Sequence, residues 1–304
     1  MQKIHSSSLD LLKYLLSILI VIIHFRPDNY GILFGYIPSE LARCAVPAFF
    51  IISGYFMSFD NEKINQWLLK ISKLYVIWSF SYFIYFYFVK ESPIDAYFIL
   101  SSIVSGWGHL WYFPALIFAY VIASALKQKR SSVLISISLI LLISGIYIQY
   151  TKNQIISVNG YRNFLFIGLP FILIGILIKR FYVKITNVKC FLYLIILLLS
   201  TSFFEYYYNV KNGIEYELPL LSIPLSIVIV IFFSKIKFKS NFITVFLGNS
   251  SVAIYLIHPL LIDIVKTYNI SNIYILNLTL ILVVSSIIYF ISKKIWIDKL
   301  FFGK

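Results

Sequence analysis

Apolar residues occur along the chain in long runs, and short polar segments separate these runs. A helix needs about 20 apolar residues to cross a bilayer core about 30 Å thick. The pattern predicts an all-α, polytopic integral membrane protein with about ten transmembrane helices. An even number of spans puts both termini on one side of the membrane. Residues 95–107 are too short to span, and we expect a re-entrant or interfacial segment there. The predicted spans are residues 9–26, 41–59, 69–89, 109–126, 132–150, 163–181, 190–208, 217–234, 243–266 and 273–292.

The first predicted span carries four polar residues in an otherwise aliphatic helix, namely Asp10, Lys13, Ser17 and His24. At about 100° per residue they fall on one stripe about 60° wide. An intramembrane charge costs about 2.5–3.5 kcal/mol even on lenient scales, so such residues are functional candidates. The alternative is that Lys13 and His24 lie at the two interfaces, where a long side chain can reach the headgroups.

The second span contains two further candidates. Arg43 lies near its outer end, one turn before Pro47, where we expect the helix to kink. Arg43 either serves a site there or anchors the helix at the interface. Ser53 and Gly54 form a small patch that suits either function or close helix packing.

Two later spans begin with candidate residues. His109 and Trp111 open the span 109–126, where His109 either points into an outer vestibule or caps the helix. Arg162 lies at the outer boundary of the span 163–181, as a site residue or a plain anchor. Gly168 and Pro170 interrupt that span, which predicts an irregular helix that lines protein or water.

His258 lies deep in the span 243–266, directly before Pro259. The proline removes a donor and frees the carbonyl of Tyr255, so His258 either bonds to that carbonyl as a structural residue or serves a site. Asp263 lies about 140° around the helix from His258, so the two do not form a dyad on one face.

Composition and charge support a membrane protein and set its orientation. The chain is 60% hydrophobic and 12% charged, so we expect residues 1–304 to form a single transmembrane domain without a separate soluble domain. Of the 26 Lys and Arg residues, 18 fall on the side of the N-terminus, which predicts cytoplasmic termini. The net charge of +14 is scattered over several short segments, which favours lipid contact over nucleic acid. Cys44 and Cys190 are predicted near opposite faces, without a disulfide or metal site.

Five blocks in order resemble the motifs of acyltransferase family 3, a family of integral membrane enzymes that O-acylate bacterial surface glycans. The resemblance covers residues 8 to about 292. Where the family usually has arginine in the first helix, this chain has Lys13, which keeps the charge but loses the bidentate fork. The blocks are Asp10-Leu-Leu-Lys13 followed by His24, Pro47-Ala-Phe-Phe-Ile-Ile-Ser-Gly54-Tyr, His109-Leu-Trp-Tyr-Phe-Pro, Arg162-Asn-Phe-Leu-Phe-x-Gly-Leu-Pro170 and Tyr255-Leu-Ile-His-Pro259.

The resemblance implies transfer of an acetyl group from cytoplasmic acetyl-CoA, without a metal, to a hydroxyl of an extracytoplasmic polysaccharide or its lipid-linked precursor. It also implies a multi-pass protein of the bacterial inner membrane. His24 would be the base or a transient acyl carrier, and Lys13 with Asp10 would complete the catalytic set and help to hold the donor. The implied substrate-binding residues are Arg43, Ser53, His109, Trp111, Arg162 and His258.

Two other functions stay open. Discontinuous helices with charged linings also suit a transporter of a glycan intermediate or of a small amino acid. A catalytically inactive scaffold in a glycan-assembly complex is a further alternative, and only the lysine at position 13 favours it.

Overall fold

Every regular element in the described part of this computed structural model is a helix, which confirms the predicted all-α class. The chain divides into two compact units, which we describe separately. The first consists of Met1–Ile52 and Tyr182–Trp296, and the second of Ser53–Phe181 and Ile297–Lys304. A single-domain organisation stays a prediction. The structure describes residues 7–25, 41–89, 101–102, 104–151, 158–181, 187–212, 216–236 and 239–303.

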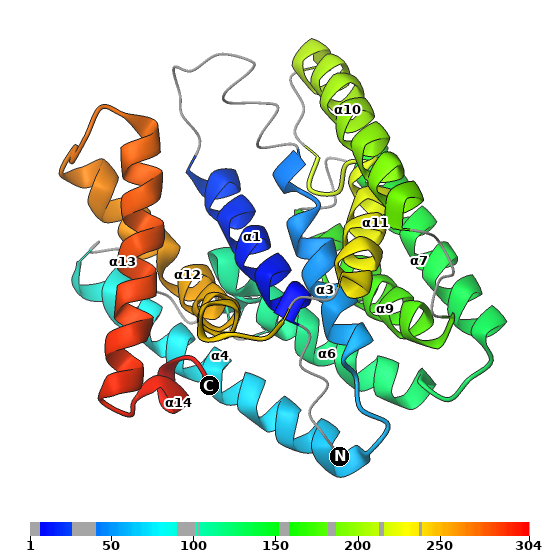
Figure 1. Cartoon of the computed structure of the whole chain (residues 1–304), viewed down its shortest axis with the longest axis horizontal. Coiled ribbons are helices and arrows are strands. Elements are labelled where there is room, and N and C mark those ends of the chain that lie inside the picture. Colours follow the sequence, from blue (N-terminus) through cyan, green and yellow to red (C-terminus); the bar gives the residue numbers. More distant parts are fainter. Residues whose placement is uncertain are drawn as a thin grey trace. The chain divides into compact units, whose positions relative to one another are not determined.

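In the first unit, α12 packs along α1 on one side and along α13 on the other (Figure 1). α10 and α11 form a second pair, and α11 also contacts α1. The helices are α1 (Ser7–His24), most of α3 (Ala45–Tyr55), α10 (Asn187–Asn212), α11 (Ser222–Lys235), α12 (Phe242–Thr267) and α13 (Tyr274–Lys294).

In the second unit, α6 contacts α4, α9 and the π-helical turn η3, and α7 packs against α9. The short helix α14 returns to α4, where the indole N–H of Trp78 donates to the Phe301 carbonyl at 2.7 Å. The helices are α4 (Asn61–Phe88), η2 (Gly108–Trp111), α6 (Tyr112–Leu126), α7 (Ser131–Tyr150), α8 (Val158–Tyr161), η3 (Phe164–Gly168), α9 (Leu169–Phe181) and α14 (Asp298–Phe301).

Seven helical segments in the described residues are long and apolar enough to cross a membrane. They correspond to seven of the ten predicted spans, so the count of ten stays a prediction. The segments are Ser7–His24, Gly108–Leu126, Ser131–Tyr150, Phe164–Phe181, Val188–Glu205, Phe242–Thr267 and Tyr274–Lys294.

The other three predicted spans differ from the structure in their lengths. α3 is a helix of only 11 residues, because a turn at Arg43 and Cys44 precedes it and Pro47 falls in its first turn, where proline is tolerated. The predicted kink at this proline is therefore a helix start.

α11 has only 14 residues. α4 begins at Asn61, well before the predicted residue 69, because the Asp60 carboxylate accepts from the Glu62 N–H at 3.0 Å and caps a polar first half.

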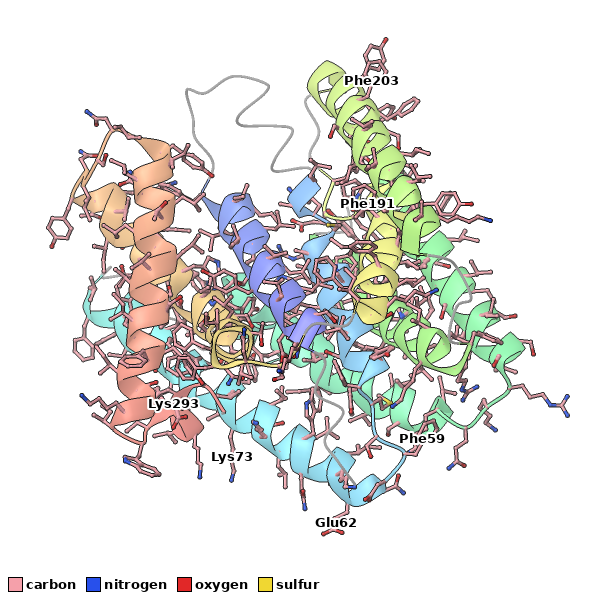
Figure 2. The ribbon with its side chains drawn as sticks, in the orientation of Figure 1. Phe59, Glu62, Lys73, Phe191, Phe203 and Lys293 are labelled. Atoms are coloured by element: carbon pink, nitrogen blue, oxygen red, sulfur yellow. The ribbon has the colours of Figure 1, made fainter. Side chains whose placement is uncertain are left out.

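Apolar side chains are also plentiful on the outside of the helices, as a lipid environment requires. On α10, Phe191 and Phe203 (labelled in Figure 2) are 49% and 67% exposed. Such a surface would be unstable in water over so large an area. The structure therefore supports a multi-pass membrane protein.

Cys44 and Cys190 are both buried and free. The predicted interfacial segment, residues 95–107, lies mostly outside the described residues. Within the described part of the chain, no three His, Cys, Asp or Glu side chains gather in a way that could hold a metal ion.

Candidate functional site

The polar stripe of α1 faces α12 at a very close helix contact. Gly248 of α12 lies against Asp10, so that a Cβ at position 248 would be only 2.4 Å from the Asp10 Cβ. Only glycine allows the backbones to approach this closely, so the packing of the start of α1 against α12 depends on Gly248. The sequence did not single out Gly248, although its place in a Gly-Asn-Ser-Ser segment is typical of helix packing.

At one end of the stripe, Asp10 and Lys13 form an ion pair within the helix. The Lys13 Nζ donates to Asp10 Oδ1 at 3.0 Å, and the carboxyl side chain is largely buried. Ser17 is fully buried, and its hydroxyl donates to the Tyr14 carbonyl at 2.7 Å, one turn back. The bond to its own helix accounts for Ser17 without a functional role.

At the other end of the stripe, His24 meets His258 of α12. The centroids of the two imidazole rings are 5.2 Å apart, with an angle of 38° between the planes. The sequence predicts no such pair, because the two residues lie on helices that are distant in the chain. About 16 Å of helix separates Lys13 from His24, so the ion pair and the histidine pair occupy different depths.

The hydrogen bonds of His258 define its tautomer. Its Nδ1 lies 2.8 Å from the Tyr255 carbonyl and 3.1 Å from the Ile254 carbonyl. Both oxygens can only accept, so Nδ1 carries a hydrogen, and in the neutral ring Nε2 is then the nitrogen with the lone pair. Pro259 has no N–H for the Tyr255 carbonyl, so the predicted structural bond is present. The ring is also completely buried, and this bond orients it next to His24.

Arg43 is 7% exposed and is therefore no interfacial anchor with its head in water. Its Nη1 donates to Glu217 Oε2 at 3.1 Å. Burial and the neighbouring Tyr208 raise the pKa of the adjacent Tyr216 to about 12, so this phenol stays protonated at physiological pH. The sequence missed Glu217 as a partner, since nothing in a loop acid indicates which distant arginine it meets.

In the second unit, the structure brings Trp111 and Arg162 together. The Arg162 guanidinium carbon lies 5.3 Å from the Trp111 ring centroid, within the range of a cation–π contact. Both line a cavity of about 130 Å³ that also includes Ser105 and Asn163. A cavity of this size is too small to enclose a whole ligand.

The helix after Arg162 is irregular, as Gly168 and Pro170 predict. It begins with the π turn η3, and the Asn163 side chain accepts from the N–H groups of Leu165 and Phe166 at 2.9 and 3.1 Å. π turns are rare in proteins, and those that occur are often found at functional sites. Here the turn and its cap place Arg162 beside the cavity.

Two predicted residues of this unit lie apart from that cavity. His109 is 5% exposed and packs edge-on against Tyr82, at 4.9 Å between centroids, and it does not line the cavity. Ser53 is half-buried and hydrogen-bonded to the Tyr112 hydroxyl. The sequence missed Tyr82 because it is one of many aromatic residues along α4.

The structure thus sorts the predicted residues into two sets, each within one unit. Their roles as catalytic and substrate-binding residues stay predictions. The first set is Asp10, Lys13, His24, Arg43 and His258, and the second is Ser53, His109, Trp111 and Arg162.

Comparison with known proteins identifies the family. A curated relative, an amino-acid racemase of Enterococcus faecalis, is 25% identical over 304 aligned positions, which cover 87% of this chain and 42% of the racemase. The chain thus spans less than half the length of that relative. No solved structure matches the chain significantly. The family model of the acyltransferase domain (Acyl_transf_3) matches residues 6–292, nearly the whole chain, so the protein belongs to acyltransferase family 3.

Proposed function

We propose that the protein is an O-acetyltransferase that moves an acetyl group from cytoplasmic acetyl-CoA to a hydroxyl of an extracytoplasmic polysaccharide or of its lipid-linked precursor. The observation that carries the proposal is the contact of His24 with the buried His258, in a chain of an acyltransferase family. Imidazole exchanges protons near neutral pH, as acyl transfer to a hydroxyl requires.

In the proposed reaction, a His24 nitrogen takes the proton of the acceptor hydroxyl while the oxygen attacks the thioester carbonyl. The C–S bond breaks, and the CoA thiolate takes the proton from the imidazolium. In a second route, the nitrogen attacks first and carries the acetyl group until the hydroxyl displaces it. His258, whose Nε2 keeps a lone pair, is the positioning residue that accepts a hydrogen bond from His24.

The roles proposed for the remaining candidates follow from the side of the membrane on which each residue is predicted to lie. The predicted orientation has about ten spans and both termini in the cytoplasm. Lys13, paired with Asp10, helps to hold the donor at the inner end of α1. Its single ammonium acts as a point charge where an arginine would make two bonds. Trp111 and Arg162 bind the acceptor beside their cavity, and Arg43 and His109 belong to the same predicted outer side. Ser53 is a further proposed substrate-binding residue.

Purified protein with radiolabelled acetyl-CoA and surface glycan tests the proposal. His24→Ala should lower acetyl transfer by about 10²- to 10⁴-fold and remain folded in detergent. The matched control is Ser17→Ala, on the same stripe, which should keep full activity because, among the described residues, the Ser17 hydroxyl bonds only to its own helix. Wild-type protein that transfers no acetyl group to any glycan fraction would contradict the proposal. Label retained on wild-type protein without acceptor would select the acyl-carrier route.

The second candidate function is transport of a glycan intermediate or of a small amino acid. The relative named amino-acid racemase favours an amino acid, since a racemase acts on one and the matched part of it is similar to this chain. Purified protein in liposomes distinguishes the two functions. Uptake of an amino acid without acetyl transfer would support transport and contradict the enzyme.

A further inference from the structure

A cavity in the second unit is lined by three basic side chains. It has a volume of about 250 Å³ and lies where the end of α3, the end of α6 and the end of α9 meet. Phe59 (labelled in Figure 2) belongs to the short connection between α3 and α4 that covers it. The lining residues are Gly54, Met57, Ser58, Phe59, Lys127, Ile176, Lys179 and Arg180.

The two lysines have only neutral partners within the described part of the chain. Lys127 is 4% exposed, and its Nζ donates to the Asn61 side-chain oxygen at 2.8 Å. Lys179 donates to the Met57 carbonyl at 3.1 Å and lies 5.9 Å from the Phe59 ring centroid. The buried ammonium of Lys127 has no counter-charge there, which is costly, so the cavity favours an anion; Lys179 is exposed and can contact the same anion.

Arg180 stabilises the backbone next to the cavity. Its guanidinium donates to the carbonyls of Lys127 and Lys129, which lie just beyond the end of α6. Cations at a helix C-terminus stabilise the unpaired carbonyls there. Arg180 thus fixes the backbone that carries Lys127, and it is a positioning residue for the cavity.

Gly54 brings the covering connection close to α9. A Cβ at this position would lie 2.0 Å from the Ile172 carbonyl oxygen, so no other residue fits. This close contact places the Met57 carbonyl within reach of Lys179. The cavity is therefore a built feature of the fold, in contrast to lysines that only follow the positive-inside pattern and reach the headgroups.

The size and charge of the cavity indicate which part of a ligand it takes. Pockets that enclose a whole small molecule measure about 300–1,000 Å³, so this one fits only a portion of a large donor. Phosphate groups carry the charge that two ammonium groups complement. We infer that this cavity binds phosphate groups of the CoA donor, an assignment that rests on the proposed function.

Equilibrium binding to purified protein in neutral-lipid nanodiscs tests the inference, with CoA and with pantetheine, which has no phosphate. Lys179→Gln should weaken CoA binding about tenfold, as expected for one charge-assisted hydrogen bond, and leave pantetheine binding unchanged. Lys179→Arg should restore most of the affinity. The matched control is Lys129→Gln, because Lys129 is exposed on the same loop and does not line the cavity.

Four results would overturn the inference: no CoA binding by the wild-type protein, an unchanged affinity in Lys179→Gln, an equal loss for both ligands, or a loss only of anionic lipid added to the nanodiscs. The last result would assign the cavity to a headgroup phosphate. CoA binding that depends on Lys179 without any acetyl transfer would contradict the proposed function and leave the phosphate site in place.

Discussion

At the scale of single residues, His258 combines two tasks in one ring. Its Nδ1 donates to the Tyr255 carbonyl, which the neighbouring proline leaves without a donor, and its opposite nitrogen lies on the side of the ring that can accept from a partner. Because the ring is completely buried, its loss would also leave a void. A structural and a positioning role are separable, since asparagine and glutamine each mimic one side of imidazole.

We expect His258→Asn to keep the bond to the Tyr255 carbonyl, and with it the fold, but to lower acetyl transfer by about 10²-fold, because the group that positions His24 is lost. The readouts are the melting temperature in detergent and the transfer rate from acetyl-CoA. His258→Ala should lose both stability and activity. An active His258→Asn variant would show that the residue is only structural.

The buried ion pair of Arg43 with Glu217 gives a second prediction at this scale. Glu217→Gln removes the negative charge that the 7% exposed guanidinium of Arg43 contacts and should destabilise the protein by about 1–3 kcal/mol. The control is Asp60→Asn, which breaks the exposed pair of Asp60 with Lys63 and keeps a good helix cap. Thermal unfolding of both variants in detergent measures the difference, and equal melting temperatures would refute the prediction.

At the scale of the helices, the contact of α1 with α12 decides where the polar stripe lies. Gly248 is the position at which the two backbones come closest, against Asp10. In a helix interior, alanine usually stabilises relative to glycine by about 1 kcal/mol. Here the added methyl group has no room, so packing opposes the intrinsic preference of the residue.

We expect Gly248→Ala to destabilise the protein by about 1–3 kcal/mol, because an atom 2.4 Å from Asp10 Cβ forces the helices apart. Asn249→Ala, the next residue of the same helix, gains helix propensity without this clash and should be neutral or slightly stabilising. Detergent melting curves compare the two. A Gly248→Ala variant more stable than wild type would contradict the prediction, because it would show that α1 and α12 can accommodate the added methyl group.

The long apolar runs predicted the long helices well, because a bilayer crossing requires a continuous apolar segment. α12, at Phe242–Thr267, and α13, at Tyr274–Lys294, differ from their predicted spans by only one or two residues at each end. The polar first half of α4 was missed, since hydropathy detects the membrane and not the helix. Two features could not be predicted in this way, namely the ring contact of His24 with His258 and the lysine cavity. Both depend on the packing of segments that are distant in the chain, and a single sequence does not show which segments pack together.

At the scale of the whole molecule, the positions of Lys and Arg predict which loops face the cytoplasm. The loop after α6 is among the basic ones, and the loop between α12 and α13 has the opposite predicted orientation. Both proposals depend on this orientation, because CoA is supplied from the cytoplasm.

Cysteines introduced into intact cells test the orientation. Gln128→Cys should react with a membrane-impermeant maleimide only after the cells are permeabilised, whereas Ile270→Cys should react in intact cells. Both side chains are exposed, and the native cysteines are buried, so the parent protein is the background control. The reverse pattern would place the lysine cavity on the wrong side for CoA.

The ion pair of Asp10 with Lys13 also has a consequence for the order of synthesis. α12, which covers the stripe of α1, is made near the end of the chain, so at about 5–20 residues per second α1 waits roughly ten to fifty seconds for its partner. During that time an isolated charge in the bilayer would be expensive. A pair made within one helical turn is available as soon as α1 forms, and it lets the helix enter the membrane before its partner exists.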